Sequence, residues 1–259
     1  MKTDFLSPFI ALLITVSFLA CTPEQNIEPA KELQSRSAAF FDYGSEVFYL
    51  GDHNPQLLPA TSPSLEGEFK ATPDLLAIDP HTGSIDLTKS ETGLTYRISF
   101  TAKNGQVFER NLTVAGMDYQ TSAIDFSKSV YWKPTYIGEE GAAMPEAQFT
   151  QLKDVASGIN YAAALDEYTG AVNMKKLIKI AGLKAGEGRI FEVKYQLGDK
   201  SDYAQNSIRI NVYYSPDLHE APYEYQLATG LIEGAARESD EAAFEEINKQ
   251  RPPLGMGGE

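Results

Sequence analysis

Short runs in which apolar and polar residues alternate recur through the middle of the chain. They occupy residues 46–50, 94–100, 106–114, 191–197 and 207–214. Alternation with a period of two, enriched in β-branched and aromatic residues, is typical of strands that bury one face. Asn104-Gly105 lies between two of these runs, and this pair accepts the positive φ angles of a tight hairpin turn. The pattern predicts an all-β chain.

Two stretches of the chain are nearly the same. One reads AIDPHTGSIDL from Ala77 to Leu87, and the other reads ALDEYTGAVNM from Ala164 to Met174, an offset of 87 residues. In each, Thr-Gly supplies a turn in which glycine takes a positive φ, and an aspartate at the turn's entrance can accept backbone N–H groups. The apolar positions on either side alternate as strand residues do. We interpret the repeat as a hairpin corner that occurs once in each of two domains.

The corner and the strand that follows it, such as Tyr96–Gly105, resemble the immunoglobulin-like and cadherin-like repeats of bacterial surface proteins. The resemblance covers about residues 70–117 and 158–214, with a longer insertion before Phe191 in the second copy. It implies two tandem immunoglobulin-like β-sandwiches. We place them at residues 39–117 and 118–215.

The segments that bind calcium in cadherins differ here. At those places this chain has Ser90-Glu91-Thr92 and Ala102-Lys103-Asn104-Gly105, and Asp199 is the one acidic residue that remains. A Ca²⁺ site takes about six to eight oxygen ligands, so one carboxylate is too few. We therefore expect no calcium, and no other metal or cofactor.

The first residues have the pattern of a secretory signal peptide. Lys2 precedes an apolar run from Phe9 to Ala20, which is short for a transmembrane span. Phe18-Leu19-Ala20-Cys21 resembles a bacterial lipobox, in which the cysteine is acylated and becomes the new N-terminus. Cys21 is also the only cysteine, so it has no partner for an internal disulfide. We predict a signal peptide at 1–20 and a lipid anchor on Cys21; the alternative is a secreted protein with a spare thiol.

Residues 21–38 are polar and without a sustained apolar period, so they predict a flexible tether. Glu24, close behind the acylated cysteine, is similar to the acidic residue found there in surface-exported lipoproteins of glycan-degrading Gram-negative bacteria. That resemblance favours the outer membrane and exposure at the cell surface. The expected partners are therefore the membrane, through the lipid anchor, and an outer-membrane protein complex.

Residues 216–259 depart from the repeat. From Asp217 onward there are ten acidic and three basic side chains, a net charge of −7. Ser239–Lys249 predicts a short helix, capped by Ser239, with Phe244 and Ile247 on one side. This stripe is too small to fold by itself, so the helix docks on its own domain or on a partner protein. The last residues, PPLGMGGE, are typical of a disordered tail.

Charge and motifs exclude several functions. The formal net charge of −14 argues against a nucleic-acid partner, because phosphate binding needs a basic face. The three histidines, His53, His81 and His219, are scattered, and no nucleophile elbow, phosphate loop or dinucleotide fingerprint is present. We expect that the protein is not an enzyme.

One aromatic segment is a candidate for ligand binding. Val130–Tyr136 holds the only tryptophan, Trp132, between Tyr131 and Tyr136. Exposed aromatic rings with polar tips suit the faces of sugar rings or a protein hot spot. The competing interpretation, which we favour for Trp132, is that it packs in the core of the second sandwich.

These observations support three hypotheses for a non-catalytic surface lipoprotein. The first is an accessory or docking subunit of an outer-membrane assembly for nutrient uptake or secretion, with the acidic tail as its handle. The second is a surface glycan-binding protein, resembling the lipoproteins that accompany outer-membrane polysaccharide transporters. The third is an adhesin. A sandwich fold hosts all three functions, so the fold does not choose between them.

Overall fold

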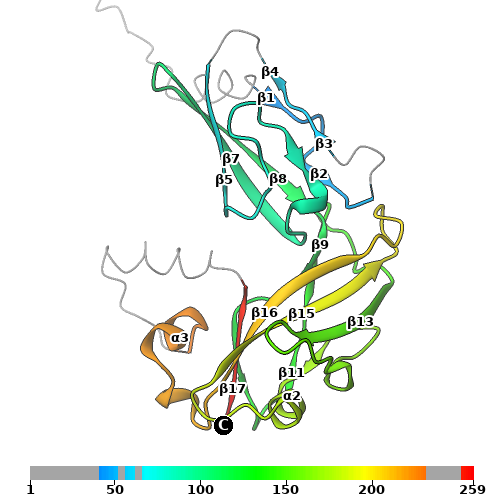
Figure 1. Cartoon of the computed structure of the whole chain (residues 1–259), viewed down its shortest axis with the longest axis vertical. Helices are drawn as coiled ribbons and strands as arrows, with labels where there is room; N and C mark the ends of the chain where they lie inside the picture. The colour runs from blue at the N-terminus through cyan, green and yellow to red at the C-terminus, as the bar shows by residue number, and fades with distance from the viewer. Residues whose placement is uncertain (1–40, 52–55, 62–65, 232–251) are drawn as a thin grey trace, which may run out of the picture.

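The computed structural model describes residues 41–51, 56–61, 66–231 and 252–259. Strands dominate these residues and form two main sheets, which follow one another along the long axis of the molecule (Figure 1). The all-β prediction is confirmed. The predicted leader, tether, Cys21 and C-terminal helix with Phe244 and Ile247 lie outside the described residues.

The first sheet has the strand order β2-β8-β7-β5. Its strands are β2 (Val47–Phe48), β8 (Val107–Val114), β7 (Leu94–Ala102) and β5 (Gly67–Thr72); smaller pairs join β1 (Phe41–Asp42) to β4 (Ala60–Thr61) and β3 (Gln56–Leu57) to β6 (Ile85–Asp86). β7 and β8 form the hairpin predicted at Asn104-Gly105, where Gly105 has φ 85°. Alternate residues of β7, including Tyr96 and Ile98, are buried in the first core, as the period-two pattern predicts.

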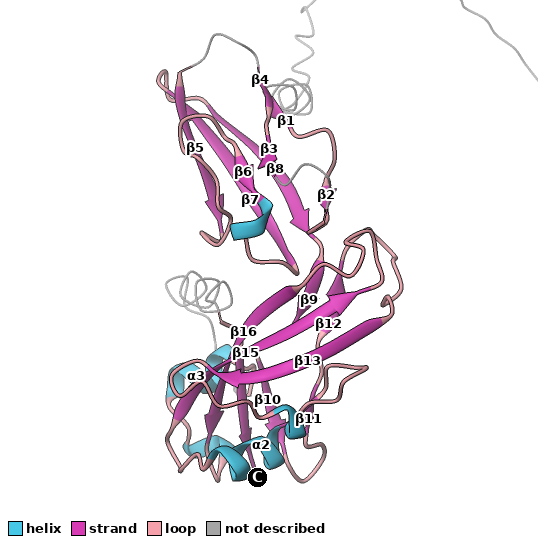
Figure 2. Ribbon diagram, turned by 45° about the vertical axis from the view of Figure 1, so that its right-hand side comes forward, coloured by secondary structure: helices cyan, strands magenta, loops and turns pink. Residues whose placement is uncertain are grey.

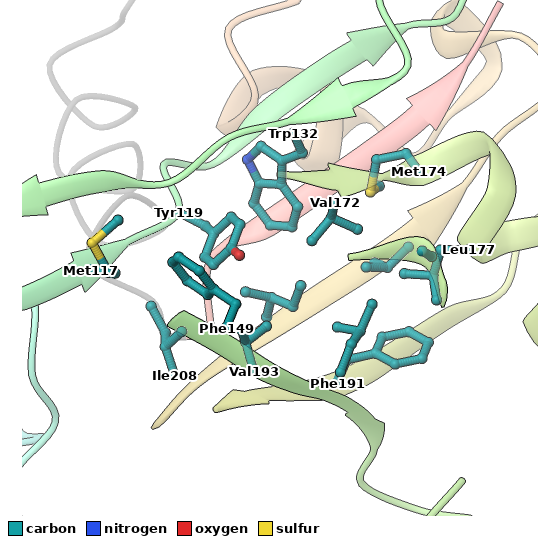
Figure 3. Close-up of a cluster of buried hydrophobic side chains, with 14 of the residues drawn as sticks. Met117, Tyr119, Trp132, Phe149, Val172, Met174, Leu177, Phe191, Val193 and Ile208 are labelled. Carbon is teal, nitrogen blue, oxygen red and sulfur yellow. The ribbon is translucent and has the colours of Figure 1, made fainter. Parts of the chain in front are cut away.

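The second sheet has the strand order β10-β17-β16-β15-β13. Its strands are β10 (Ser122–Asp125), β17 (Leu254–Gly258), β16 (Asn206–Tyr214), β15 (Gly188–Leu197) and β13 (Ala147–Asp154). The opposing layer consists of the pairs β9 (Gly116–Asp118) with β12 (Thr135–Ile137) and β11 (Tyr131–Trp132) with β14 (Val172–Asn173), together with α2 (Met174–Ala181). Figure 3 shows Trp132, Val172 and Leu177 of this layer facing Phe191 and Ile208 of the sheet across the second core.

The two repeated stretches are hairpin corners, as predicted. Isolated bridges pair Ile78 with Ile85 and Leu165 with Val172 across them. Oδ1 of Asp79 accepts N–H groups of His81 and Thr82, and Oδ1 of Asp166 accepts those of Tyr168 and Thr169. These backbone hydrogen bonds are the largest cause of the lowered pKa of both aspartates. The same local chemistry therefore builds the same turn in both domains.

Each corner also rests on a ring from the first long strand of its domain. A methyl group on Gly83 would lie 2.9 Å from ring atoms of Phe69, and one on Gly170 would lie 2.4 Å from the ring of Phe149. Both glycines have positive φ, 68° and 69°. Glycine is needed at each corner because it meets two demands at once: a left-handed turn and contact of its backbone with a phenyl ring.

A third corner of the same kind was missed at Asp154-Val-Ala-Ser-Gly. Oδ1 of Asp154 accepts the N–H groups of Ala156 and Ser157, and Gly158 has φ 73°. Burial by itself would raise the pKa of Asp154, but these donors and Arg189, 3.6 Å away, outweigh it and lower the pKa. The signal, Asp followed by Ser-Gly at the same spacing, was present in the sequence.

The prediction of a disordered C-terminal tail is wrong. Residues Leu254–Gly258 form β17, which is parallel to both β10 and β16 and is buried along its whole length. The glycines that suggested disorder are required by close packing, because the ring of Trp132 lies on Gly255 and that of Phe126 lies on Gly257. The last strand of the predicted C-terminal segment, β17, therefore belongs to the second sheet.

The segment between the sheets is fixed by one buried tyrosine. Tyr195 of β15 is fully buried, and its hydroxyl accepts the N–H of Met117 at 2.9 Å and shares a hydrogen bond with Thr92 Oγ1, also at 2.9 Å. Thr92 precedes β7 of the first sheet, whereas Met117 lies in β9 of the second domain. Tyr195 of the second domain is thus hydrogen-bonded both to the first domain, at Thr92, and to the segment that leaves it, at Met117.

A second set of contacts lies beside this joint. Nζ of Lys200 lies 5.4 Å from the ring centre of Tyr49 and pairs with Glu139, and the hydroxyl of Tyr136 donates to Asp199 at 2.8 Å. Tyr49 belongs to the first domain, and the other residues follow the connection. With the Tyr195 hydrogen bonds, these contacts hold the two domains in one orientation.

We expect Gly83→Ala to destabilise the first domain more than Gly105→Ala, by about 1–3 kcal/mol. Both positions have positive φ, so both variants carry the strain of a left-handed alanine, but only the methyl group on Gly83 meets a ring, whereas nothing lies within 4 Å of one on Gly105. Urea unfolding of the two variants measures the difference. Equal losses would show that the contact with Phe69 does not matter.

Met256→Ala should cost about 2–5 kcal/mol of unfolding free energy, because Met256 is fully buried in β17. The matched control is Met144→Ala, whose side chain is exposed and should be neutral within about 0.5 kcal/mol. Fluorescence of Trp132, the only tryptophan, follows the unfolding from the hydrophobic cluster on the other face of the same sheet. Similar losses in both variants would contradict the burial of β17.

Tyr195→Phe should cost about 1–3 kcal/mol, because it leaves the buried groups of Thr92 and Met117 without their partner. Burial, as the largest cause, raises the pKa of Tyr195 from 10.0 to about 12. The neutral phenol therefore stabilises the fold fully below about pH 10, and this contribution is lost as the pH rises toward about 12.

Urea unfolding between pH 8 and pH 12 tests this, with the exposed Tyr223→Phe as control. The wild type and the control should lose stability more steeply at alkaline pH than Tyr195→Phe. Identical slopes in all three proteins would refute the role assigned to the Tyr195 hydroxyl.

Candidate binding site

The structure separates the three aromatic residues that the sequence brought together. Trp132 is 3% exposed, and its indole N–H donates to the carbonyl of Gln120 at 2.9 Å. Its ring packs edge-on against Tyr119, with ring centres 5.1 Å apart (Figure 3). The favoured core interpretation is confirmed, and Trp132 as a ligand-binding residue is wrong, because its faces are covered by the protein.

Tyr136 belongs to the interdomain contacts. Its ring is half-buried, and its hydroxyl donates to Asp199 Oδ2. Burial, followed by the neighbouring carboxylate of Asp199, raises the pKa of Tyr136 far above its usual range. Its hydroxyl is thus already engaged in the joint, so Tyr136 does not extend a surface that begins at Tyr131.

Tyr131 remains as the candidate. Neighbouring strand residues point to opposite faces, so burying Trp132 turns Tyr131 outward, where its side chain is 50% exposed. Its backbone is fixed by pairing with Asn173 of β14, and its N–H donates to Ser129 Oγ at 3.2 Å. The ring is therefore held on a rigid strand.

A groove of about 690 Å³ lies beside Tyr131. β10 and the turn after it form one side, and the 3₁₀ turn η3 (Leu218–Glu220) and Leu231 contribute the other. Ser122, Ser129 and Lys133 are polar residues that line the groove together with Tyr131. An aromatic face with a few hydroxyl and amine groups can stack on a sugar ring and hydrogen-bond its hydroxyls.

The carboxylates of this groove are engaged locally. Asp125 accepts the N–H and the hydroxyl of Ser127 and pairs with Lys128 at 3.0 Å. The pKa of Asp125 is lowered to about 2, and the hydrogen bond from the Ser127 hydroxyl is the largest cause. Glu259 lies 3.6 Å from Lys175. Among the described residues, no group of three or more His, Cys, Asp or Glu side chains could hold a metal ion.

A larger groove, of about 800 Å³, lies on the outer face of the first sheet. Its charged side chains include Arg97 and Glu109, which approach each other to 3.8 Å. Tyr43 is the aromatic residue in its lining, but the Tyr43 hydroxyl donates to the carbonyl of Gly83, and burial raises its pKa above the usual range. This groove offers no well-exposed ring, so the Tyr131 groove is the better candidate.

Sequence reasoning identified Tyr131 but missed the rest of its groove. Leu218, Leu231 and Glu259 are more than eighty residues away from Tyr131 in the chain. They reach it because β17 inserts beside β10 and places the end of the sequence there. No local pattern carries that information, because the pairing joins Ser122 to Gly255.

Comparisons with known proteins give solved structures but no family. No protein-family model matches the chain, and no curated protein does. A SusE-like surface-located polysaccharide-binding protein from the heparin utilisation locus of Bacteroides thetaiotaomicron matches with 13% identity and a TM-score of 0.23, over 65% of this chain and 92% of its own.

Two animal proteins match in the same way. Murine CEACAM1b has 8% identity and a TM-score of 0.20, over 65% of this chain and 94% of its own. The human desmocollin-1 ectodomain has 11% identity and a TM-score of 0.19, over 69% of this chain and 45% of its own. TM-scores this low leave the function to be argued from the groove itself. No helix within the described part of the chain combines the length and apolar character needed to span a bilayer.

Proposed function

We propose that this chain is a non-catalytic, lipid-anchored protein of the cell surface that binds polysaccharide at the far end of its second domain. The observation that carries the proposal is the half-exposed ring of Tyr131 in a groove of about 690 Å³. The predicted signal peptide and the acylation of Cys21 support the location at the outer membrane.

The Tyr131 ring suits a sugar because it needs little ordering on binding. Its strand is paired on one side with β14, and the neighbouring Trp132 anchors that strand in the core. A rigid aromatic platform loses little conformational entropy when a ligand stacks on it, so more of the contact energy contributes to affinity.

The position of the groove also fits a surface role. In Figures 1 and 2, β1, where the described chain begins, lies in the domain at one end, and β11 and α2 lie toward the opposite end. The Tyr195 joint holds the domains in one orientation. An anchor that precedes β1 would thus present the groove away from the membrane.

An accessory role in an outer-membrane assembly for nutrient uptake is compatible with polysaccharide binding and stays a prediction. Its proposed handle, Phe244 and Ile247, lies outside the described residues. The end of the sequence is not a free handle, because β17 is part of the second sheet. A test of docking must therefore delete only residues 239–249 and leave 252–259 in place.

The proposed function predicts that Tyr131→Ala weakens polysaccharide binding at least about tenfold, which corresponds to about 1.4 kcal/mol. Affinity electrophoresis of the full chain in gels containing amylopectin, xylan, mixed-linkage β-glucan, polygalacturonate or chondroitin sulfate measures the binding. The control is Tyr168→Ala, since Tyr168 is 70% exposed but does not line the groove.

The control should bind as the wild type does. Wild-type protein that is retarded by none of the five polysaccharides, or Tyr131→Ala protein that is retarded unchanged, would show that the proposal is wrong. Co-purification of a membrane partner that is lost on deletion of 239–249 would then favour the docking hypothesis.

A further inference from the structure

The two domains differ most in the segment that follows the repeated corner. In the first domain, the corner passes through the 3₁₀ turn η1 (Leu87–Lys89) and reaches β7 at Leu94. In the second, Met174 takes the place of Leu87, and the chain forms α2 before it reaches β15 at Gly188. The second domain thus carries an inserted segment, residues 175–187, at an otherwise shared position.

The insertion is basic within an acidic protein. It contains Lys175, Lys176, Lys179 and Lys184, all exposed, and one acidic residue, Glu187. The whole chain has a formal net charge of −14. This segment is therefore positively charged, whereas the chain as a whole is negatively charged.

The fold of α2 does not require four lysines. α2 is fixed by other residues: Asn173 caps its start by accepting the N–H of Lys176, Gly182 ends it with φ 66°, and its apolar residues, such as Leu177, are buried. Lys175 and Lys179 are one turn apart, where like charges destabilise a helix by a few tenths of a kcal/mol. The repulsion between Lys175 and Lys179 is thus slightly unfavourable within α2, although Lys179 in the last turn is favoured by the helix dipole.

A groove of about 550 Å³ runs beside this basic face. Lys175 and Lys179 line it together with the rings of Phe126 and Tyr214. Nζ of Lys175 lies 5.8 Å from the ring centre of Phe126 and 3.6 Å from Glu259. Glu259 also lines the groove beside Tyr131, so the two grooves are neighbours.

We infer that the polysaccharide bound at this end of the molecule is anionic, and that the lysines of α2 bind its carboxylate or sulfate groups. The inference rests on the proposed function and names its substrate class. Lysine ammonium groups on flexible stems act as mobile point charges, which suits anionic groups that repeat along a polymer without one fixed geometry. Lys128 and Lys133 also line the Tyr131 groove, where Lys128 pairs with Asp125.

Other polyanions and surfaces fit this face less well. The buried apolar side of α2 faces the core, and Ile180 is the one apolar side chain that the helix exposes widely, so the helix has no apolar face to enter a bilayer. Protein interfaces are depleted in lysine and rich in aromatic residues and arginine at their centres. Duplex DNA, with its dense charge, is opposed by the acidity of the rest of the chain.

The test uses the full chain with Cys21→Ser, which carries no acyl chain and therefore needs no detergent, and the triple variant Lys175→Gln/Lys176→Gln/Lys179→Gln in the same background. Lys70→Gln/Lys89→Gln/Lys103→Gln, on exposed positions of the first domain, is the control with the same change in net charge. Biolayer interferometry at 50 and 300 mM NaCl measures binding to polygalacturonate, chondroitin sulfate, amylopectin, duplex DNA and phosphatidylglycerol vesicles.

We expect the wild type and the control to bind at least one of the two anionic polysaccharides, with an affinity that falls as salt rises. The α2 variant should bind it at least tenfold more weakly, and neither DNA nor vesicles should bind comparably. Binding of amylopectin alone, or anionic binding that the α2 variant retains, would overturn the inference and leave the proposed function standing.

Two other results are also decisive. DNA or vesicle binding that matches polysaccharide binding, and is lost in the α2 variant, would overturn the inference by showing a general polyanion or lipid surface. No binding to any polysaccharide would overturn both the inference and the proposed function. Circular dichroism confirms that the triple variants are folded, since glutamine keeps nearly the helix propensity of lysine.

Discussion

The insertion of β17 between β10 and β16 is the contact on which the second domain depends. It gives two strands their backbone partners and places Leu254 and Met256 in apolar surroundings. Without it, the hydrogen-bonding groups along both neighbours would be unpaired, which is costly inside a sheet. The candidate site depends on the same contact, because both grooves at this end include Glu259, the residue after β17.

In both domains, aromatic rings pack directly against the backbone of glycine residues. The Trp132 ring covers Gly255 within the sheet, and the rings of Phe69 and Phe149 cover the glycines of the two corners. A ring against a bare backbone excludes water from both and leaves little room for a second arrangement. Glycine here is a packing residue, although its usual meaning in a sequence is a turn or a flexible segment.

The sequence was sufficient where the determining contacts are local. The period-two runs predicted β7, β8, β15 and β16 but not β5 or β13, Asn104-Gly105 predicted its hairpin, and the repeated aspartate and Thr-Gly predicted the corners. The sequence was misleading at PPLGMGGE. Its composition shows that the segment has few side chains to bury, but it does not show that the segment pairs with β10 and β16. For the same reason the sequence could offer Tyr131 as a candidate but could not indicate the groove beside it.

The repeat also shows where the second domain differs from the first. The corner, the aromatic ring beneath it and the capping position after it are shared: Asp86 caps η1, and Asn173, 87 residues later, caps α2. The chain then diverges into the basic helix. The segments after the two corners differ in length, and each domain still has its own buried core.

The distance along the chain between paired strands sets the order in which the two domains can form. β7 and β8 of the first sheet are joined by a tight turn, so their pairing closes a short loop. β10 pairs with β17 across most of the second half of the chain, and such non-local pairing slows folding. The first domain should therefore mature early, while the second passes through a state in which most of its sheet exists and the final strand has not yet been captured.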